Sequence, residues 1–271
     1  MNKIKDIFVA LILIAGLFSS LSVSAETKKV FVCDDENFWP PYTFQEKGAD
    51  GRVEVSGAMV ELTKEIFQLA DIPFKLVLTP WKRCLYQVEN HSGLPAYEVF
   101  INGSYSDERA EKFLVSDIVY SAGAAYFYTT SKYPDGLVID NLVDITNYKL
   151  CGVHGFNYDM YQVSSDDIAI SAGDLHAAFQ LLMSGRCELL LNAYSVPFGS
   201  KFTDKPMIDD SVRSGLIESI PSQTFHMFVS RKSSRGESLL KTINTSIEQL
   251  KASGRTETIF RKYLPDCGAE C

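Results

Sequence analysis

Short apolar runs alternate along the first half of the chain with longer segments whose apolar residues recur every three or four positions. The first pattern is typical of buried strands and the second of amphipathic helices. The runs expected to form strands are residues 29–35, 74–80 and 98–102. The segments expected to form helices are residues 57–72, 81–90 and 107–114. This alternation predicts a parallel sheet with helices on both faces.

An extended run over residues 123–134 interrupts the alternation, which then starts again. In the second half, strands are expected at 148–155 and 187–194 and a helix at 173–185. A second extended run, 224–233, precedes a helical segment, 236–264, that Gly254 interrupts. Two α/β units are therefore joined by two extended segments, and the closing helices are expected to pack on the first unit. The pattern predicts two lobes with a cleft between them, crossed by two hinge strands.

The first 25 residues are typical of an export signal. Lys3 and Lys5 form a basic start before the apolar residues 7–21. Val23 and Ala25 then occupy the small-residue positions of a signal-peptidase site. The apolar stretch is too short for a good membrane span, and no cysteine directly follows the cleavage point, so no lipid anchor is expected. We therefore expect a soluble mature protein that is exported.

The net charge argues against several classes of partner. The 271-residue chain carries −8, and removal of the signal segment, which holds Lys3, Lys5 and Asp6, makes this −9. A negative balance without a basic stripe argues against nucleic acid and against an anionic membrane surface. The remaining chain of about 246 residues suits one large domain or two smaller ones.

Six cysteines lie in the exported part, and an even number in an oxidising compartment indicates up to three disulfides. They are Cys33, Cys84, Cys151, Cys187, Cys267 and Cys271. No metal site is expected, because there is no Cys-x-x-Cys pair and the four histidines are scattered without ligand spacing.

Four segments along the chain carry recognisable motifs. They are "WPPYTFQEKGADGRVEVSGAMVELTKEI" (39–66), "SYSDERAEKFLVSDIVY" (104–120), "GVHGFNYDMY" (152–161) and "FQLLMSGRCELLLNAY" (179–194). In this order they resemble the opening pattern, the Ser/Thr-x-x-Arg signature, the Gly-rich loop of the second lobe and the helix–Gly–strand unit of one family. That family is the extracellular solute-binding proteins of family 3, the amino-acid-binding components of ABC uptake systems.

The resemblance implies the two-lobed α/β fold of type II periplasmic binding proteins. Lobe 1 is expected to comprise 26–126 and 229–271, and lobe 2 to comprise 127–228 with the hinge strands. It implies a monomer in the periplasm that closes on a small ligand with a carboxylate, an amino acid or a derivative. It also implies that this protein delivers the ligand to an inner-membrane ABC permease. It implies no cofactor and no catalysis.

Arg109 is the sharpest candidate for a binding residue. With Ser106 as the N-cap of a short helix, Arg109 falls at the third helical position, where the helix dipole disfavours a cation. A bound carboxylate compensates by taking two parallel hydrogen bonds from the guanidinium. In the family the matching arginine holds the ligand's α-carboxylate, and the residue matching Ser104 supplies a hydroxyl. The alternative is an ordinary ion pair with Glu108 or a surface acid.

Trp39 and Trp81 match aromatic positions of the family's cleft, and core packing is the alternative for both. The remaining candidates are Asn102, Gly103, Gly155, Asn157, Tyr158 and Asn192, and for those in the second lobe an ordinary loop is the alternative. The sequence departs from the family after "GRCELLL", where Ala193 aligns with an aspartate that holds the ligand's ammonium. Tryptophan faces and carbonyls would then meet the ammonium, or the ligand lacks one.

Guesses at the disulfide pairs follow from the expected elements. Cys33 and Cys84 would pair within the first lobe, Cys151 and Cys187 between neighbouring strands of the second, and Cys267 and Cys271 in a tail loop.

Two other functions remain open. Some relatives of this fold are dehydratases of prephenate-like acids, but an enzyme needs a general acid in the cleft. Glu188 is expected on a strand, and His154, the only histidine near a cleft loop, is interpreted as structural. The third possibility is a ligand-presenting subunit of a membrane sensor.

Overall fold

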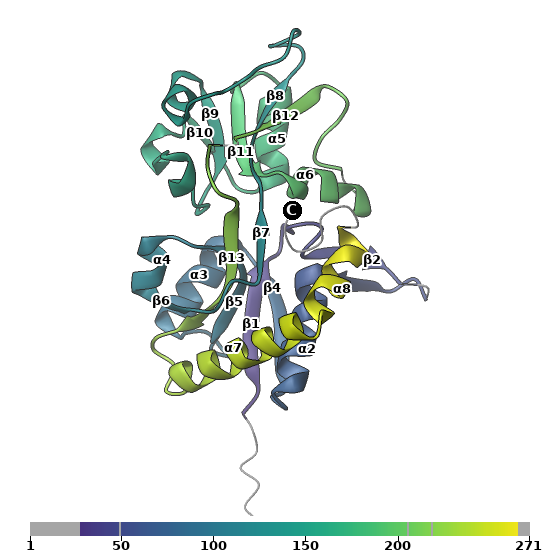
Figure 1. Cartoon of the computed structure of the whole chain (residues 1–271), viewed down its shortest axis with the longest axis vertical. Helices are drawn as coiled ribbons and strands as arrows, with labels where there is room; N and C mark the ends of the chain where they lie inside the picture. Colours follow the sequence, from purple (N-terminus) through teal and green to yellow (C-terminus); the bar gives the residue numbers. More distant parts are fainter. Residues whose placement is uncertain (1–27, 49, 205, 218, 265–271) are drawn as a thin grey trace, which may run out of the picture.

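The first lobe is built on a sheet whose strand order is β4–β1–β5–β13–β6, with β7 paired to β13. The computed structural model describes residues 28–48, 50–204, 206–217 and 219–264, and two lobes are evident in it (Figure 1). The strands of the first sheet are β1 (Val30–Asp35), β4 (Phe74–Thr79), β5 (Val99–Ser104), β6 (Phe113–Val115), β7 (Tyr120–Ala122) and β13 (Gln223–Ser230). The strands predicted at 29–35, 74–80, 98–102 and 224–233 are thereby confirmed.

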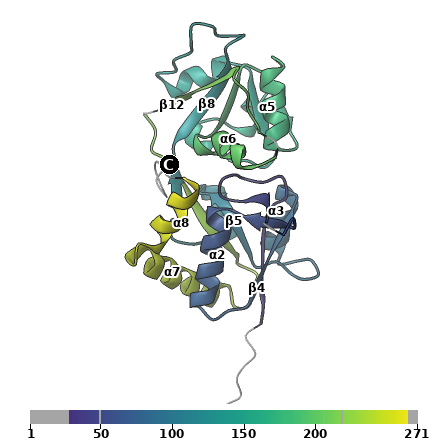
Figure 2. The same ribbon diagram turned by 90° about the vertical axis from the view of Figure 1, so that its right-hand side faces the viewer.

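Side chains of the central strand β5 alternate between two helical layers, as the pleat requires. Val99 and Ile101 belong to one apolar cluster and Phe100 to another. The first cluster lies under α2 (Ala58–Leu69), α7 (Gly236–Ala252) and α8 (Arg255–Tyr263), and the second lies under α3 (Trp81–Asn90). Figure 2 shows these helices on the two sides of the sheet. The closing helices therefore pack on the first lobe, as predicted, and Gly254 separates them with a φ of 71°.

The second lobe is built on a sheet of order β10–β9–β11–β8–β12. Its strands are β8 (Ala124–Thr129), β9 (Leu150–Val153), β10 (Ile170–Ala172), β11 (Leu189–Ala193) and β12 (Val212–Leu216). Helix α5 (Leu175–Met183) connects β10 and β11, and Asp174 caps it by accepting a hydrogen bond from the backbone N–H of Ala177 at 2.7 Å. The elements predicted in this half are confirmed.

The smaller elements complete the two lobes. They are the hairpin β2 (Phe44–Lys47) with β3 (Val53–Ser56), the helices α4 (Asp107–Lys112) and α6 (Ser195–Gly199), and the 3₁₀ helices Leu142–Asn147, Asp159–Tyr161, Ser165–Asp167 and Ser200–Phe202.

The predicted parallel pairing holds for the strands that alternate with helices, and the two hinge strands run the other way. β1 runs parallel to β4 and β5, but β13 runs antiparallel to β5, and β8 runs antiparallel to β11. Both strands enter their sheet directly from the other lobe, without the helical crossover that a parallel neighbour requires.

The chain crosses between the lobes at Gly123, between β7 and β8, and again between the end of β12 at Leu216 and the start of β13 at Gln223. Residues 124–126 pair within the second sheet and residues 223–228 within the first. Each hinge strand completes the sheet that its residues pair with, and the lobe limits at 126 and 229 stay a prediction.

Each lobe holds one disulfide, Cys33–Cys84 in the first and Cys151–Cys187 in the second. Both pairs are those guessed from the sequence. Cys267 and Cys271, like the export segment, lie outside the described residues. Among the described residues no helix is long and apolar enough to cross a membrane, and no group of His, Cys, Asp or Glu is arranged to hold a metal ion.

Candidate functional site

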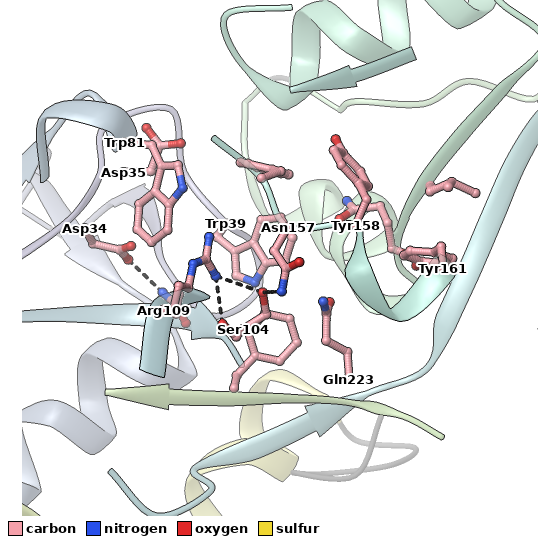
Figure 3. Close-up of a pocket in the computed structure, with 15 residues that line it drawn as sticks. Asp34, Asp35, Trp39, Trp81, Ser104, Arg109, Asn157, Tyr158, Tyr161 and Gln223 are labelled. Atoms are coloured by element: carbon pink, nitrogen blue, oxygen red, sulfur yellow. Dashed lines mark hydrogen bonds between the residues drawn. The ribbon is translucent and has the colours of Figure 1, made fainter. Parts of the chain in front are cut away.

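A cleft lies between the lobes near the carboxyl ends of β1 and β5 (Figure 3), and the empty space between its walls, including space open to solvent, is about 520 Å³. Residues from both lobes line it. From the first lobe these are Asp34, Asp35, Trp39, Trp81, Asn102, Ser104, Arg109, Gln223 and Phe225, and from the second Phe156, Asn157, Tyr158, Tyr161, Leu191 and Asn192. Eight of the ten binding residues proposed from the sequence are among them, and Gly103 and Gly155 are not.

The backbone of Arg109 lies in the first turn of α4, and neighbouring residues determine where this helix begins. The side-chain oxygen of Ser106 accepts a hydrogen bond from the backbone N–H of Arg109 at 3.2 Å, which makes Ser106 the N-cap of α4. Asp107 and Glu108 fill the first turn, so Arg109 takes the third helical position, as predicted. The backbone of this residue is thereby fixed by local chemistry.

The Arg109 side chain is buried, with 9 % of its surface exposed. Its Nη1 donates to the backbone carbonyl of Ser104 at 2.8 Å and to the hydroxyl of the same residue at 2.9 Å. No carboxylate among the described residues pairs with it, and Glu108 pairs with Lys112 instead. Burial lowers the pKa of Arg109 to about 10. The alternative of an ordinary surface ion pair is therefore wrong.

The second lobe reaches Arg109 through the backbone of Gly155. This carbonyl accepts from Arg109 Nη2 at 3.3 Å and from Trp81 Nε1 at 3.1 Å. Asn157 Nδ2 donates in turn to the carbonyl of Tyr105 at 2.7 Å. A Cβ added at Gly155 would lie 3.2 Å from Cγ of Lys82, so the loop approaches the first lobe closely. The lobes are thus bridged directly at the arginine.

Both tryptophans line the cleft and also pack in apolar clusters, so the core and cleft interpretations are not exclusive. Trp39 meets Phe156 of the second lobe edge to face at 5.5 Å, and its Nε1 donates to the hydroxyl of Tyr120 at 3.2 Å. Trp81 lies under the guanidinium of Arg109, whose Cζ is 5.7 Å from the ring centroid. That distance permits a cation–π interaction.

Two acids at the end of β1 line the cleft and were not selected from the sequence. Asp34 accepts from Asn102 Nδ2 at 2.7 Å, and Asp35 accepts from the backbone N–H of Asn37 at 3.1 Å. Burial raises the pKa of Asp34 to about 7 and that of Asp35 to about 6. Their signal was a buried strand ending in two consecutive acids, which is where ligands bind in open α/β sheets.

The position that aligns with the family's aspartate, Ala193, packs in the apolar core. Its neighbour Asn192 lines the cleft instead. Only 5 % of Asn192 is exposed, and its Nδ2 has no hydrogen-bond partner among the described residues. A buried amide donor without a partner is costly, so this group suits an acceptor atom of a ligand.

Three other residues discussed from the sequence lie away from the cleft lining. A Cβ at Gly103 would come within 2.5 Å of the Phe228 ring, so this glycine makes room for core aromatics. His154 is exposed. Glu188 pairs with Lys132 and accepts from the backbone N–H of Lys149. Phe156, Tyr161, Leu191, Gln223 and Phe225 line the cleft without having been selected from the sequence.

Solved structures similar to this chain share its two-lobed architecture. The substrate-binding protein of an amino acid ABC transporter is 14 % identical, with a TM-score of 0.69 over 88 % of this chain and 100 % of its own. A histidine kinase sensor domain with similarity to periplasmic binding proteins is 19 % identical, with a TM-score of 0.68 over 88 % and 96 %. A substrate-binding protein of an ABC uptake transporter from Streptococcus pneumoniae, with bound histidine, is 16 % identical, with a TM-score of 0.68 over 89 % and 94 %. At these identities the likeness shows a shared fold.

The sequence itself gives a more specific result. No curated protein matches the chain significantly. Residues 31–266 match the family described as bacterial extracellular solute-binding proteins, family 3. The match spans nearly the whole described chain and confirms the resemblance and the predicted type II fold. The chain belongs to the bacterial extracellular solute-binding proteins, family 3.

Proposed function

We propose that this protein captures a small zwitterion, an amino acid or a derivative of one, between its lobes and presents it to an inner-membrane ABC permease. The observation that carries the proposal is the buried guanidinium of Arg109, which has no carboxylate partner among the described residues. A buried charge is costly unless it is paired. A ligand carboxylate supplies the missing charge, and the arginine fork suits it geometrically.

The opposite charge of the zwitterion has a partner on the same lobe. Among the described residues, the Asp35 carboxylate accepts hydrogen bonds only from the backbone N–H and the side chain of Asn37, both at Oδ1. Its Oδ2 therefore retains acceptor capacity, and Asp35 lines the cleft. A cationic group of the ligand at this point would lower the pKa of Asp35. Asp35 thus binds the ammonium of the ligand, a role that Ala193 cannot fill because it has no carboxylate.

The remaining lining supports a ligand with an apolar or aromatic part. Trp39, Phe225 and Phe156 bring aromatic surface from both lobes. Asn192 adds a donor from the second lobe, which suits an amide, hydroxyl or carboxylate oxygen. Apolar walls with a few oriented polar groups are characteristic of small-molecule sites.

Closure of the lobes follows from the same contacts. Hinge closure around ligands is the known behaviour of periplasmic binding proteins. The hydrogen bond from Arg109 Nη2 to Gly155 is long, at 3.3 Å. A ligand carboxylate on the arginine makes shorter, charge-assisted bonds, while Trp81 and Asn157 keep their own bonds across the lobes.

A thermal-shift screen tests the proposal. The protein from residue 26 onward would be unfolded and refolded with its disulfides intact, to strip any bound ligand, and then screened against amino acids and small carboxylates. A ligand at about a hundred times its Kd adds about 2.7 kcal/mol to the free energy of unfolding. For a chain of this size the midpoint rises by about 5–10 °C.

The matched variants are Arg109→Ala and Arg213→Ala. Arg213 is exposed on β12 and does not line the cleft. A shift that disappears in the first variant and persists in the second supports carboxylate capture. No shift across the panel, or an equal shift in Arg109→Ala, would rule out the proposal.

The partner and compartment follow from the family and need separate tests. We infer a monomer that works in the periplasm after removal of a signal peptide. Light scattering checks the monomer, and mass spectrometry of the exported protein checks the cleavage site after Ala25. Capture of membrane proteins by the ligand-loaded protein identifies the partner, and recovery of a sensor kinase in place of a permease would contradict uptake.

A second candidate function, an acid–base enzyme, is favoured by one observation. Asp34 and Asp35 both line the cleft with raised pKa values, and such groups gather at catalytic sites. The check is proton NMR of each ligand identified by the screen, incubated with the protein for hours. New product signals that depend on Asp34 or Asp35 would establish the enzyme, and unchanged ligand would exclude it for that compound.

A further inference from the structure

The indole of Trp39 and the carboxyl of Asp34 are joined by a continuous chain of buried side chains. Trp39 Nε1 donates to the hydroxyl of Tyr120 at 3.2 Å. That hydroxyl donates to Asn102 Oδ1 at 3.0 Å. Asn102 Nδ2 then donates to Asp34 Oδ2 at 2.7 Å and to Thr43 Oγ1 at 2.9 Å. The chain joins three strands of the first lobe to the loop that carries Trp39.

The direction of every bond in this chain is determined by its first member. An indole N–H is a donor only, so the Tyr120 hydroxyl must accept from Trp39 and can then donate only to Asn102. Asn102 must therefore present its oxygen to Tyr120 and its amide group to Asp34. An ionised Asp34 completes the sequence as a terminal acceptor, and its charge strengthens the bond that it receives.

The backbone at Asn102 supports this arrangement. Its φ is 58°, in the left-handed region that side chains other than glycine rarely adopt. Asparagine is among the residues that tolerate it. Strain of this kind is retained where the surrounding structure determines it, and here it lets one amide reach both Tyr120 and Asp34.

We propose that Asp34 is a positioning residue that acts through Asn102 and Tyr120 to hold Trp39 against the cleft, and that its protonation loosens this hold. The inference rests on the proposed ligand cleft for its functional meaning, but the hydrogen-bond chain is independent of any ligand. Protonated Asp34 is a neutral and weaker acceptor, and hydrogen bonds in a chain weaken together. Because Trp39 also contacts Phe156 of the second lobe, ligand binding becomes sensitive to pH near neutrality.

The groups that surround Asp34 allow it to titrate. Burial is the main cause that raises the pKa of Asp34. Hydrogen bonds from Thr43 and Asn102 lower this pKa, and the charge of Asp35, on the same strand, raises it slightly. Tyr120 from β7 stays neutral because burial raises its pKa well above the ordinary value. β4 places Leu78 beside it in the sheet register. Arg109, from α4, lines the same cleft. Because the resulting pKa of Asp34 is about 7, the carboxyl changes its protonation state within the pH range of ordinary solution experiments.

Indole ¹⁵N–¹H NMR of the protein without added ligand tests the inference. The chain has two tryptophans. Trp39 is the reporter, and Trp81 is an internal control, because it donates to the carbonyl of Gly155, which does not titrate. Trp81→Phe assigns the signals. The expected result is a sigmoidal movement of the Trp39 resonance with a midpoint near pH 7, larger than any movement of Trp81.

Three variants decide the cause. Asp34→Asn should abolish the movement, and Asp35→Asn should retain it. Tyr120→Phe should shift the Trp39 resonance at every pH and remove its pH dependence. If Tyr120→Phe does not fold, the native protein and the two aspartate variants still decide. Persistence of the movement in Asp34→Asn, or a static Trp39 resonance in the native protein, would overturn the inference. A protein that binds none of the screened ligands would still give this result, so the two failures are distinguishable.

Discussion

Arg109 of the first lobe donates a hydrogen bond across the cleft to the carbonyl of Gly155 on the second lobe, at 3.3 Å. The same guanidinium is bonded to Ser104 through Nη1. The side chain proposed to recognise the ligand therefore also joins the two lobes. Because the Arg109 guanidinium serves both ligand recognition and lobe closure, its removal should affect ligand affinity and the contact between the lobes.

Replacing Arg109 should separate ligand affinity from stability. Arg109→Ala should weaken binding of a carboxylate ligand by about 2–5 kcal/mol, as for loss of one partner of a buried charge pair. Arg109→Lys keeps the charge but loses the two parallel hydrogen bonds of the guanidinium, so its ligand affinity should lie between that of the native protein and that of Arg109→Ala. Arg109→Met, which fills the space without a buried charge, should leave the unliganded protein at least as stable as the native one. Calorimetric titration and thermal unfolding measure the two quantities.

The contrary outcome is also clear. If Arg109→Met unfolds many degrees below the native protein while its ligand affinity is unchanged, the arginine is structural and the carboxylate site lies elsewhere.

Asp34 should make stability fall as pH rises towards neutrality. Its pKa in the folded protein, about 7, lies above its ordinary value of 3.8, so the folded state binds more protons in this interval. The stabilisation is fully present below pH 3.8 and is lost as pH rises through about 7. At about 1.4 kcal/mol per pH unit, the Asp34→Asn variant should gain up to about 4 kcal/mol on the native protein between pH 4 and pH 8.

Urea unfolding of both proteins at four pH values between 4 and 8 gives the difference directly. Asp35 contributes in the same direction, because its pKa is also raised, to about 6, but it is present in both proteins and largely cancels. A difference that is constant with pH would show that Asp34 does not titrate in this range.

Each disulfide should stabilise its own lobe. The pair Cys33–Cys84 spans 51 residues and the pair Cys151–Cys187 spans 36. Closing loops of this size restricts the unfolded chain, and loss of either should cost about 2–5 kcal/mol. The double variants Cys33→Ser/Cys84→Ser and Cys151→Ser/Cys187→Ser, compared by denaturant unfolding, check this. Equal stability of a double variant and the native protein would contradict formation of that bond in solution.

Gly103 should be intolerant of a methyl group although it does not line the cleft. Its added Cβ would lie 2.5 Å from the Phe228 ring and 2.6 Å from the Phe100 ring. Overpacking of this kind costs about 1–3 kcal/mol. The control is Gly173→Ala, because a Cβ there meets no atom within 4 Å. Thermal unfolding should show a lower midpoint for Gly103→Ala only, and similar midpoints would indicate that β5 yields at this point.

The helices and strands that the sequence predicted could be found because their signals are local, whereas the hairpin of β2 and β3 and the short strands β6, β7, β10 and β12 were not predicted. The apolar spacing of 57–72 and of 236–264 is set by the helical repeat, whatever these helices later contact. Ser106, Asp107 and Glu108 define the start of α4 within a few residues, and this placed Arg109 at its third position before any tertiary contact was known. Motifs in the expected order extended this to the family and to eight lining residues.

The tertiary structure decided the features that depend on residues distant in sequence. β13 runs antiparallel to β5 because it arrives from the other lobe, and no local pattern records that direction. The pKa of Asp34 is raised because the fold buries this carboxyl, and Asn102, 68 positions further on, donates a hydrogen bond to it there. Asn192 lines the cleft and its neighbour Ala193 packs in the apolar core, because successive side chains of a strand point to opposite faces of the sheet. The apolar face of a helix or strand follows from residue spacing within that element. The partner of a buried charge depends on which distant segment of the chain packs beside it in the fold.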